Sequence, residues 1–422
     1  MNRLLIIHRH DNRNTRLSKK SLRNRIKRKA KEYANPFKIT ETKKREENYQ
    51  KSVVRYSDDI EMFCSYNKIY RWKTSNNLIK LNDEFSLFEK PETVLRTLLE
   101  MLHRAKISPQ ITRMRYEGKV SFGALYLIDN LCWEIAKKRR WQIICENISE
   151  TEKEKLSNLR SLFSSTYETS HAYMINERVR INRTADAIEN QSYRVKSKDI
   201  TDMVQRAIQE CGNMPTFELP FDVHQTIAST IGEHFDNIIL HAPEAEIGIL
   251  CGFYDKETKE VTLLIYNFGK TISDTLVAEN LPEQMKKEIY NIIESHVKKN
   301  LFEIKGKFNP ENALTLLALQ EGVSSRVKFD KSRGHGLIDF IEHCFTLSQE
   351  TRIVIISGRT AIKIDKSYQI GKKILFERER RVIAMNPTND IYERPDENYV
   401  VNLNVTFPGV LIETTIPLSH LT

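Results

Sequence analysis

The hydrophobic pattern of the first half predicts alternating helices and strands. Apolar residues recur at helical spacing in residues 92–104 and again in 122–138. Short apolar runs in 111–116 and 141–145 have the length and composition of strands. The order helix, strand, helix, strand is typical of a small α/β unit. Residues 150–198 are charged and rich in helix formers, and we interpret them as a linker that contains a pair of helices.

The second half has a clearer order of predicted elements. Residues 226–242 have the periodicity of an amphipathic helix. Two apolar, strand-like runs follow, 247–254 and 261–266, and the polar turn between them predicts a β-hairpin. Further along the chain, residues 337–344 are expected to form an apolar helix.

Neither a membrane span nor a secretion signal is apparent. No apolar run approaches the roughly 18 residues that cross a bilayer, and the run at the N-terminus is shorter than the core of a signal peptide. The six cysteines are scattered and include no C-x-x-C pair, which is typical of a reducing compartment. We therefore expect a cytoplasmic protein that has no membrane partner.

The net charge of +10 is concentrated at the N-terminus. Residues 1–50 contain 16 Lys and Arg against 5 Asp and Glu, a net +11, so the rest of the chain is close to −1. This arm has too few apolar residues for a core of its own. Its functional interpretation is electrostatic binding of nucleic acid or of an acidic protein surface. The alternative is a solvated tail that aids solubility.

One face of the predicted helix 226–242 carries residues that suit phosphate chemistry. Glu233, Asn237 and His241 stand four residues apart and therefore lie along one face. A carboxylate can hold or deprotonate a water, and an amide oxygen one turn later can coordinate Mg²⁺. A solvated polar stripe has the same spacing, so this helix alone does not decide between the two interpretations.

Two glycine-containing segments follow. The second hairpin strand runs into Asn267-Phe268-Gly269, where a glycine lets a flat base approach the backbone closely. Gly334 and Gly336 flank His335 directly before the apolar helix, and glycine-rich backbone at a helix N-terminus presents free N–H groups to phosphate. Further donors stand upstream, at Ser324, Ser325, Arg326, Lys328 and Arg333.

Taken together, these segments resemble the GHKL (Bergerat-fold) superfamily, which includes type II topoisomerases, histidine kinases and anti-sigma-factor kinases. The features that carry the resemblance are E-x-x-x-N-x-x-x-H on a helix, a hairpin, N-x-G, a variable helical stretch and G-x-S-S…R-G-x-G-L. Residues 401–418 also look like the closing strands of that fold. The resemblance implies an α+β architecture in which a mixed sheet is covered by helices, a Bergerat-type α/β sandwich.

The resemblance also implies ATP and Mg²⁺ as ligands. Glu233 would position or activate the attacking water, and Asn237 would coordinate Mg²⁺. Asn267 would contact the adenine amine, with Gly269 allowing the base to pack. The family usually has Asp at the position of Asn267, but an amide oxygen can still accept from the amine. The residues expected along the phosphates and in the lid over them are Ser324, Ser325, Arg333, Gly334, His335 and Gly336.

A second, shorter resemblance concerns the first half. Residues 120–125 resemble part of STAS domains, small α/β modules that dock onto regulatory partners. We therefore divide the chain into a basic arm (1–55), a small α/β regulatory domain with its helical linker (56–195) and an ATP-binding domain (196–422).

The expected function is that of an ATP-hydrolysing switch that couples nucleotide state to a protein partner. One alternative is an anti-sigma-factor-like serine kinase or a histidine-kinase-like phosphotransfer protein. However, neither His103 nor His171 is followed by the acidic residue that typically accompanies a phosphoacceptor. The other alternative is a non-catalytic adaptor that binds nucleic acid or an acidic partner through the basic arm. A homodimer is compatible with each of these.

Overall fold

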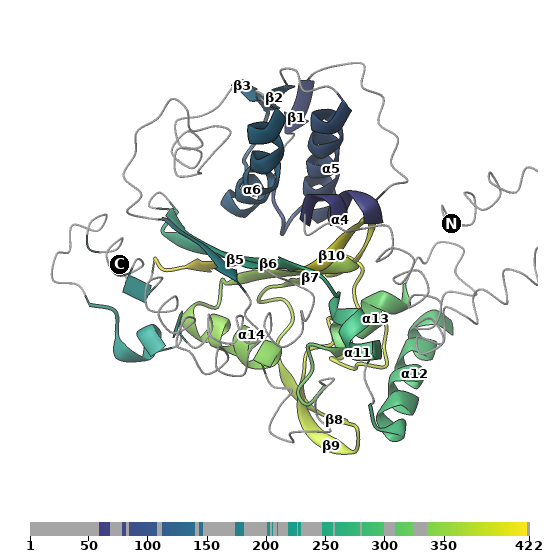
Figure 1. Cartoon of the computed structure of the whole chain (residues 1–422). Coiled ribbons are helices and arrows are strands. Elements are labelled where there is room, and N and C mark those ends of the chain that lie inside the picture. Colours follow the sequence, from purple (N-terminus) through teal and green to yellow (C-terminus); the bar gives the residue numbers. More distant parts are fainter. Residues whose placement is uncertain are drawn as a thin grey trace, which may run out of the picture.

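The computed structural model of the chain has an α+β architecture, as predicted (Figure 1). The residues that it describes are 59–67, 78–81, 84–107, 112–139, 143–146, 174–180, 201–202, 205, 209, 218–225, 227–228, 247–255, 258–278, 281–298, 309–323 and 336–419.

The N-terminal unit is a three-stranded parallel sheet with helical connections. Its strands are in the order β1-β2-β3, and both neighbouring pairs are parallel. Parallel neighbours need a crossover, which the two amphipathic helices supply. The predicted alternation of helices and strands is therefore confirmed. The elements are α4 (Asp59–Tyr66), β1 (Leu78–Leu81), α5 (Pro91–Ile107), β2 (Thr112–Tyr116), α6 (Phe122–Arg139) and β3 (Ile143–Glu146).

A larger, five-stranded sheet forms the centre of the molecule. Its order is β4-β5-β6-β10-β7, and every pairing is antiparallel. The expectation of a mixed sheet is therefore wrong for these strands. β6 and β7 do run in the same direction, but β10 inserts between them and pairs with both. The strands are β4 (Met174–Arg180), β5 (Ile247–Asp255), β6 (Glu260–Phe268), β7 (Arg352–Ile364) and β10 (Val400–Pro417).

The predicted helical linker is wrong over β4. Met174–Arg180 pairs with β5 from Met174↔Phe253 to Arg180↔Ile247. Strand pairing with the edge of an existing sheet satisfies the backbone of this segment, and such tertiary context overrides local helix propensity.

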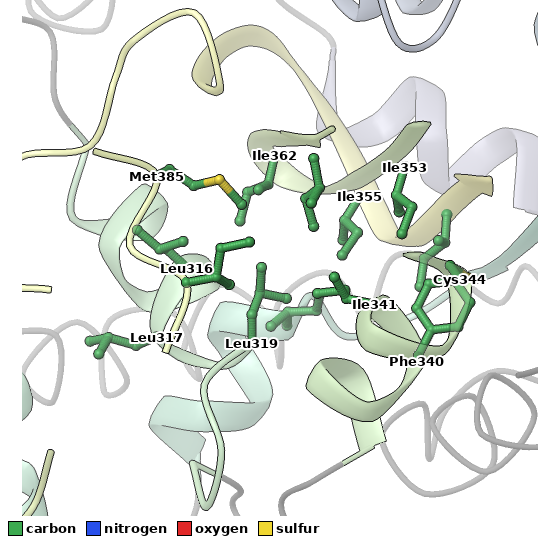
Figure 2. Close-up of a cluster of buried hydrophobic side chains, with 14 of the residues drawn as sticks. Leu316, Leu317, Leu319, Phe340, Ile341, Cys344, Ile353, Ile355, Ile362 and Met385 are labelled. Atoms are coloured by element: carbon green, nitrogen blue, oxygen red, sulfur yellow. The ribbon is translucent and has the colours of Figure 1, made fainter. Parts of the chain in front are cut away.

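Helices cover one face of the large sheet. Figure 1 shows α11, α13 and α14 beneath it. Apolar side chains of these helices and of the sheet form one core cluster, and Figure 2 shows residues of α13, α14 and β7 that meet in it. The elements on this side, with their bounds, are α11 (Ile272–Ala278), α12 (Glu283–Lys298), α13 (Pro310–Leu317), α14 (Gly336–Leu347) and the hairpin of β8 (Gly371–Leu375) and β9 (Arg378–Val382).

The N-terminal unit covers the other face, with which it shares a second core cluster. Phe122 of α6 stacks on Phe253 of β5, with ring centroids 4.3 Å apart. The side-chain amide of Asn67, directly after α4, donates to the Thr406 carbonyl at 2.8 Å and accepts from the Thr406 N–H at 2.9 Å. The large sheet is thus buried on both faces, which explains why its central strands are apolar almost throughout.

Side chains alternate between these two cores along β6. Val261, Leu263 and Ile265 belong to the core beneath the sheet, whereas Leu264 and Phe268 belong to the core shared with the N-terminal unit. Because successive side chains of a strand point to opposite faces, each position on β6 can be assigned to one of the two layers.

Candidate functional site

Asn267 is the last residue of β6 that points toward the helix layer. It follows Val261, Leu263 and Ile265 on the same face. Its relative exposure is 2%, and the one hydrogen bond that its side chain makes within the described part of the chain is a long one, 3.5 Å, from Nδ2 to the Phe268 carbonyl. Its Oδ1 accepts no hydrogen bond from the described residues. The polar groups of buried residues are normally paired, so this side chain is a candidate ligand contact.

The backbone around Asn267 is packed so closely that only glycine fits beside it. Gly409 lies on the neighbouring strand at φ +149°, and a Cβ there would stand 2.0 Å from the Asn267 carbonyl oxygen. Gly269 has φ +138°, and its N–H donates to the Pro408 carbonyl at 3.0 Å. Both glycines hold conformations that other residues rarely adopt. The turn after β6 is therefore fixed against β10.

Polar side chains near the end of β6 hold the start of α11. Ser357 of β7, Val410 of β10 and Asn267 form one row across the sheet. The buried Ser357 hydroxyl donates to the Gly409 carbonyl at 2.8 Å and accepts from the Ile272 N–H at 2.9 Å. In contrast to Asn267, the Ser357 hydroxyl is thus fully used within the protein.

The start of α13 is held against β7 in the same way. The Glu311 carboxylate accepts from the Arg359 N–H at 3.1 Å, and Asn312 accepts from the Thr360 hydroxyl at 2.9 Å. A Cβ on Gly358 would stand 1.7 Å from the Glu311 carboxylate, and Gly358 has φ +59°. These polar groups therefore have a structural role.

The α14 helix and the first part of β7 are of similar length. The chain reverses within residues 348–351, where the Thr351 N–H donates to the Ser348 carbonyl at 3.1 Å. The 12-residue helix is about 18 Å long. The distance along β7 from its start to Ser357 is similar, about 17 Å. Figure 1 shows α14 beneath the sheet, and a helix of this length that ran antiparallel to β7 would begin level with Ser357.

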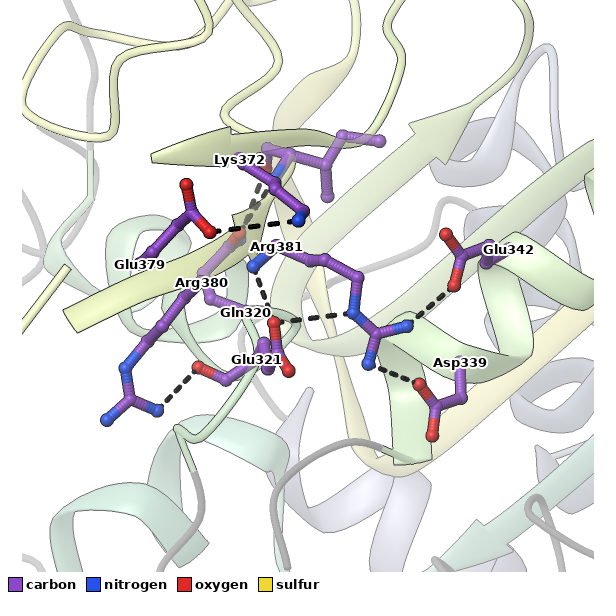
Figure 3. Close-up of polar contacts among 9 residues, drawn as sticks. Gln320, Glu321, Asp339, Glu342, Lys372, Glu379, Arg380 and Arg381 are labelled. Carbon is purple, nitrogen blue, oxygen red and sulfur yellow. Dashed lines mark hydrogen bonds and ion pairs between the residues drawn. The ribbon is translucent and has the colours of Figure 1, made fainter. Parts of the chain in front are cut away.

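Arg381 of β9 forms a network of ion pairs that sequence reasoning missed (Figure 3). Its guanidinium contacts Glu321, Asp339 and Glu342 at 3.3, 2.6 and 2.6 Å. Its backbone N–H also donates to Glu321, at 2.6 Å. Burial alone would lower the pKa of Arg381, but hydrogen bonds to Asp339, Glu321 and Glu342 outweigh it and raise the pKa. A spatial cluster drawn from three separate segments leaves no local sequence signal.

A buried carboxyl lies on the opposite face of the sheet. Glu413 of β10 is 3% exposed, and its Oε2 has no hydrogen-bond partner among the described residues. Gly123 in the first turn of α6 lies directly against it, since a Cβ there would stand 1.7 Å from Oε2. Burial raises the pKa of Glu413 to about 7, and the nearby charge of Arg352 opposes this rise.

Most of the residues expected to bind ATP and Mg²⁺ lie outside the described residues. Asn267 and Gly269 are placed at the end of β6, and Gly336 is the first residue of α14. The others are Glu233, Asn237, Ser324, Ser325, Arg333, Gly334 and His335, and His241 of the same predicted helix also lies outside the described residues. Within the described part of the chain, no group of three His, Cys, Asp or Glu residues is placed to hold a metal ion.

Comparisons with known proteins add no relative. No protein-family model matches the chain, and neither a curated protein nor a solved structure shows significant similarity to it. In the part of the chain that the structure describes, every helix is too short or too polar to cross a membrane.

Proposed function

We propose that this protein binds ATP·Mg²⁺ in a pocket of the GHKL type and acts as an ATP-hydrolysing switch that couples nucleotide state to a protein partner. The observation that carries the proposal is the buried Asn267 side chain, whose Oδ1 accepts no hydrogen bond from the described residues. It is a buried acceptor at a strand end, beside a glycine turn, on the side of the sheet that the helices cover. The amine of adenine could donate the hydrogen bond that Asn267 Oδ1 does not receive from the described residues.

The order of the elements supports the proposal. A hairpin (β5 and β6) leads into Asn267 and Gly269, then come α11 to α13, then α14, and then the antiparallel strands β7 and β10. This is the order that the sequence resemblance implies. The strands that close the chain flank the Asn267 row directly, because Val410 pairs with Asn267 and Ser357 pairs with Val410.

The phosphate side of the proposed site is the start of α14. The N–H groups in the first turn of a helix have no partner within the helix, and the helix dipole favours an anion there. In this proposal the start of α14 lies near Asn267, so that one bound nucleotide places its base at Asn267 and its phosphates at this turn. In this proposal Asn237 coordinates Mg²⁺ and Glu233 activates water.

Packing across the sheet supports a switch rather than an isolated binding domain. Phe268, next to Asn267, points into the other core, where its ring lies 5.1 Å from that of Phe407. The Phe407 ring lies 6.1 Å from Phe63 of α4. A shift of the backbone at Asn267 would therefore be transmitted to the N-terminal unit through the contacts of Phe268 with Phe407 and of Phe407 with Phe63.

Nucleotide titrations test the proposal. Wild-type protein should bind ATP more tightly with Mg²⁺ than with a chelator, and Asn237→Ala should remove this difference. Glu233→Ala should bind ATP but hydrolyse it at least about 100-fold more slowly, because general-base loss costs that much or more. The exposed Glu218, replaced by Ala, is the matched control. An unchanged rate in Glu233→Ala removes its assigned role, and absence of any ATP binding contradicts the proposal.

A further inference from the structure

The carboxylates around Arg381 come from two elements that are separated in the chain. Glu321 stands in the turn after α13, whereas Asp339 and Glu342 stand in the first two turns of α14. The guanidinium is a planar fork with fixed donor directions, so its contacts set relative position as well as charge. Arg381 therefore fixes the start of α14 relative to the turn after α13.

Neighbouring contacts make this connection rigid. The Arg380 guanidinium donates to the Glu321 carbonyl at 3.0 Å, and a Cβ on Gly322 would stand 1.2 Å from that guanidinium. The buried Gln320 side chain accepts from the Ile383 N–H at 2.8 Å and donates to the Ile383 carbonyl at 3.1 Å. The turn after α13 is thus attached to β9 and the residues that follow it by both backbone and side chains.

Arg381 also changes the electrostatic potential at the start of α14. A helix N-terminus attracts anions, but Asp339 and Glu342 place two negative charges in the same turns. Both are paired with Arg381, whose side chain is 23% exposed and so only partly screened by water. Without this arginine, the two carboxylates would repel a phosphate chain bound at that helix end.

We propose that Arg381 is a positioning residue for the phosphates of the bound nucleotide. It holds the start of α14 in place and offsets part of the negative charge that Asp339 and Glu342 bring there, so the affinity that the phosphates add depends on it. This inference rests on the proposed function. It assigns Arg381 no contact with the nucleotide.

The test compares ATP with AMP, because both contain the base and only ATP carries the full phosphate chain. We expect Arg381→Gln to weaken Mg·ATP binding by about tenfold or more, the effect of losing at least one charge-assisted contact. AMP affinity should change less than about twofold. Arg381→Lys keeps the charge without the fork and should lose ATP affinity by a smaller factor, again without an effect on AMP. If Arg381→Gln does not fold, the comparison of ATP with AMP in Arg381→Lys still tests the inference.

Arg378→Gln is the matched control, since Arg378 is exposed on the same strand and should affect neither nucleotide. Equal loss of ATP and AMP affinity in the Arg381 variants would indicate a general structural role and overturn the inference. So would unchanged ATP affinity in both. A wild-type protein that binds neither nucleotide contradicts the proposed function itself, and this result is obtained before any variant is made.

Discussion

Replacing Glu413 with Gln is expected to stabilise the protein at pH 8 and to have a much smaller effect, under about 1 kcal/mol, at pH 5. The Glu413 carboxyl is buried between β10 and the first turn of α6, and no described residue hydrogen-bonds to its Oε2. Burial without a partner disfavours the charged form. Glutamine has nearly the same shape as the protonated acid and cannot ionise, so it removes only this cost.

The magnitude follows from the pKa of Glu413, which burial raises from the ordinary 4.5 to about 7. Because the folded-state pKa is the higher one, the stability that it contributes is complete below pH 4.5 and is lost as the pH rises to about 7. At about 1.4 kcal/mol per pKa unit, the cost at pH 8 is about 3 kcal/mol. The N-terminus of α6 favours a negative charge by about 0.3–1 kcal/mol, and by about 2 at most. The desolvation cost therefore exceeds the favourable effect of the helix N-terminus. The expected gain in the free energy of unfolding for Glu413→Gln at pH 8 is about 1–3 kcal/mol.

Urea unfolding followed by circular dichroism at pH 5 and pH 8 measures this gain. The control is Glu379→Gln, since the Glu379 side chain is 64% exposed and its only ion pair in the described residues is a 3.7 Å contact with Lys372. It should shift stability by less than about 0.5 kcal/mol at either pH. If Glu413→Gln shows the same pH dependence as wild type, or is less stable at pH 8, the carboxyl is not the uncompensated buried charge described above.

Three further substitutions test other contacts. Gly123→Ala would force the Glu413 carboxyl to move and should destabilise the protein by about 1–3 kcal/mol in urea unfolding; an unchanged midpoint would show that this contact is loose. Asn67→Ala leaves the Thr406 N–H and carbonyl unpaired, at an expected cost of about 1–3 kcal/mol in the same assay. Asn267→Asp should raise the preference for ATP over GTP by about tenfold or more in competition titrations, because a carboxylate cannot donate to the guanine oxygen.

Local patterns in the sequence predicted several elements well. The helical spacing of residues 92–104 and 122–138 corresponds to α5 and α6, and the hairpin corresponds to β5 and β6. In these segments the buried face is regular, so periodicity alone indicates the structure. The sequence does not predict the strand Met174–Arg180, because its strand character depends on pairing with β5, which is distant in sequence.

Some residues of the candidate site could likewise be predicted from the sequence, and others could not. Asn267 and Gly269 could be identified because a strand, a polar residue and a glycine follow one another directly. Arg381 could not, because its partners Glu321 and Asp339 are far from it in the chain. Nor does the sequence show that Glu413 is buried, since it stands in a strand whose two faces are both covered, where polar and apolar positions do not alternate.

The central claim is that Asn267 and the start of α14 hold opposite ends of one nucleotide. Its most direct test is a crystal structure of the full chain with Mg²⁺ and a non-hydrolysable ATP analogue. We expect the adenine amine within hydrogen-bond distance of Asn267 Oδ1, and the phosphates at the first turn of α14 beside Gly336. A nucleotide bound elsewhere, or saturating analogue with no density at Asn267, would contradict the claim.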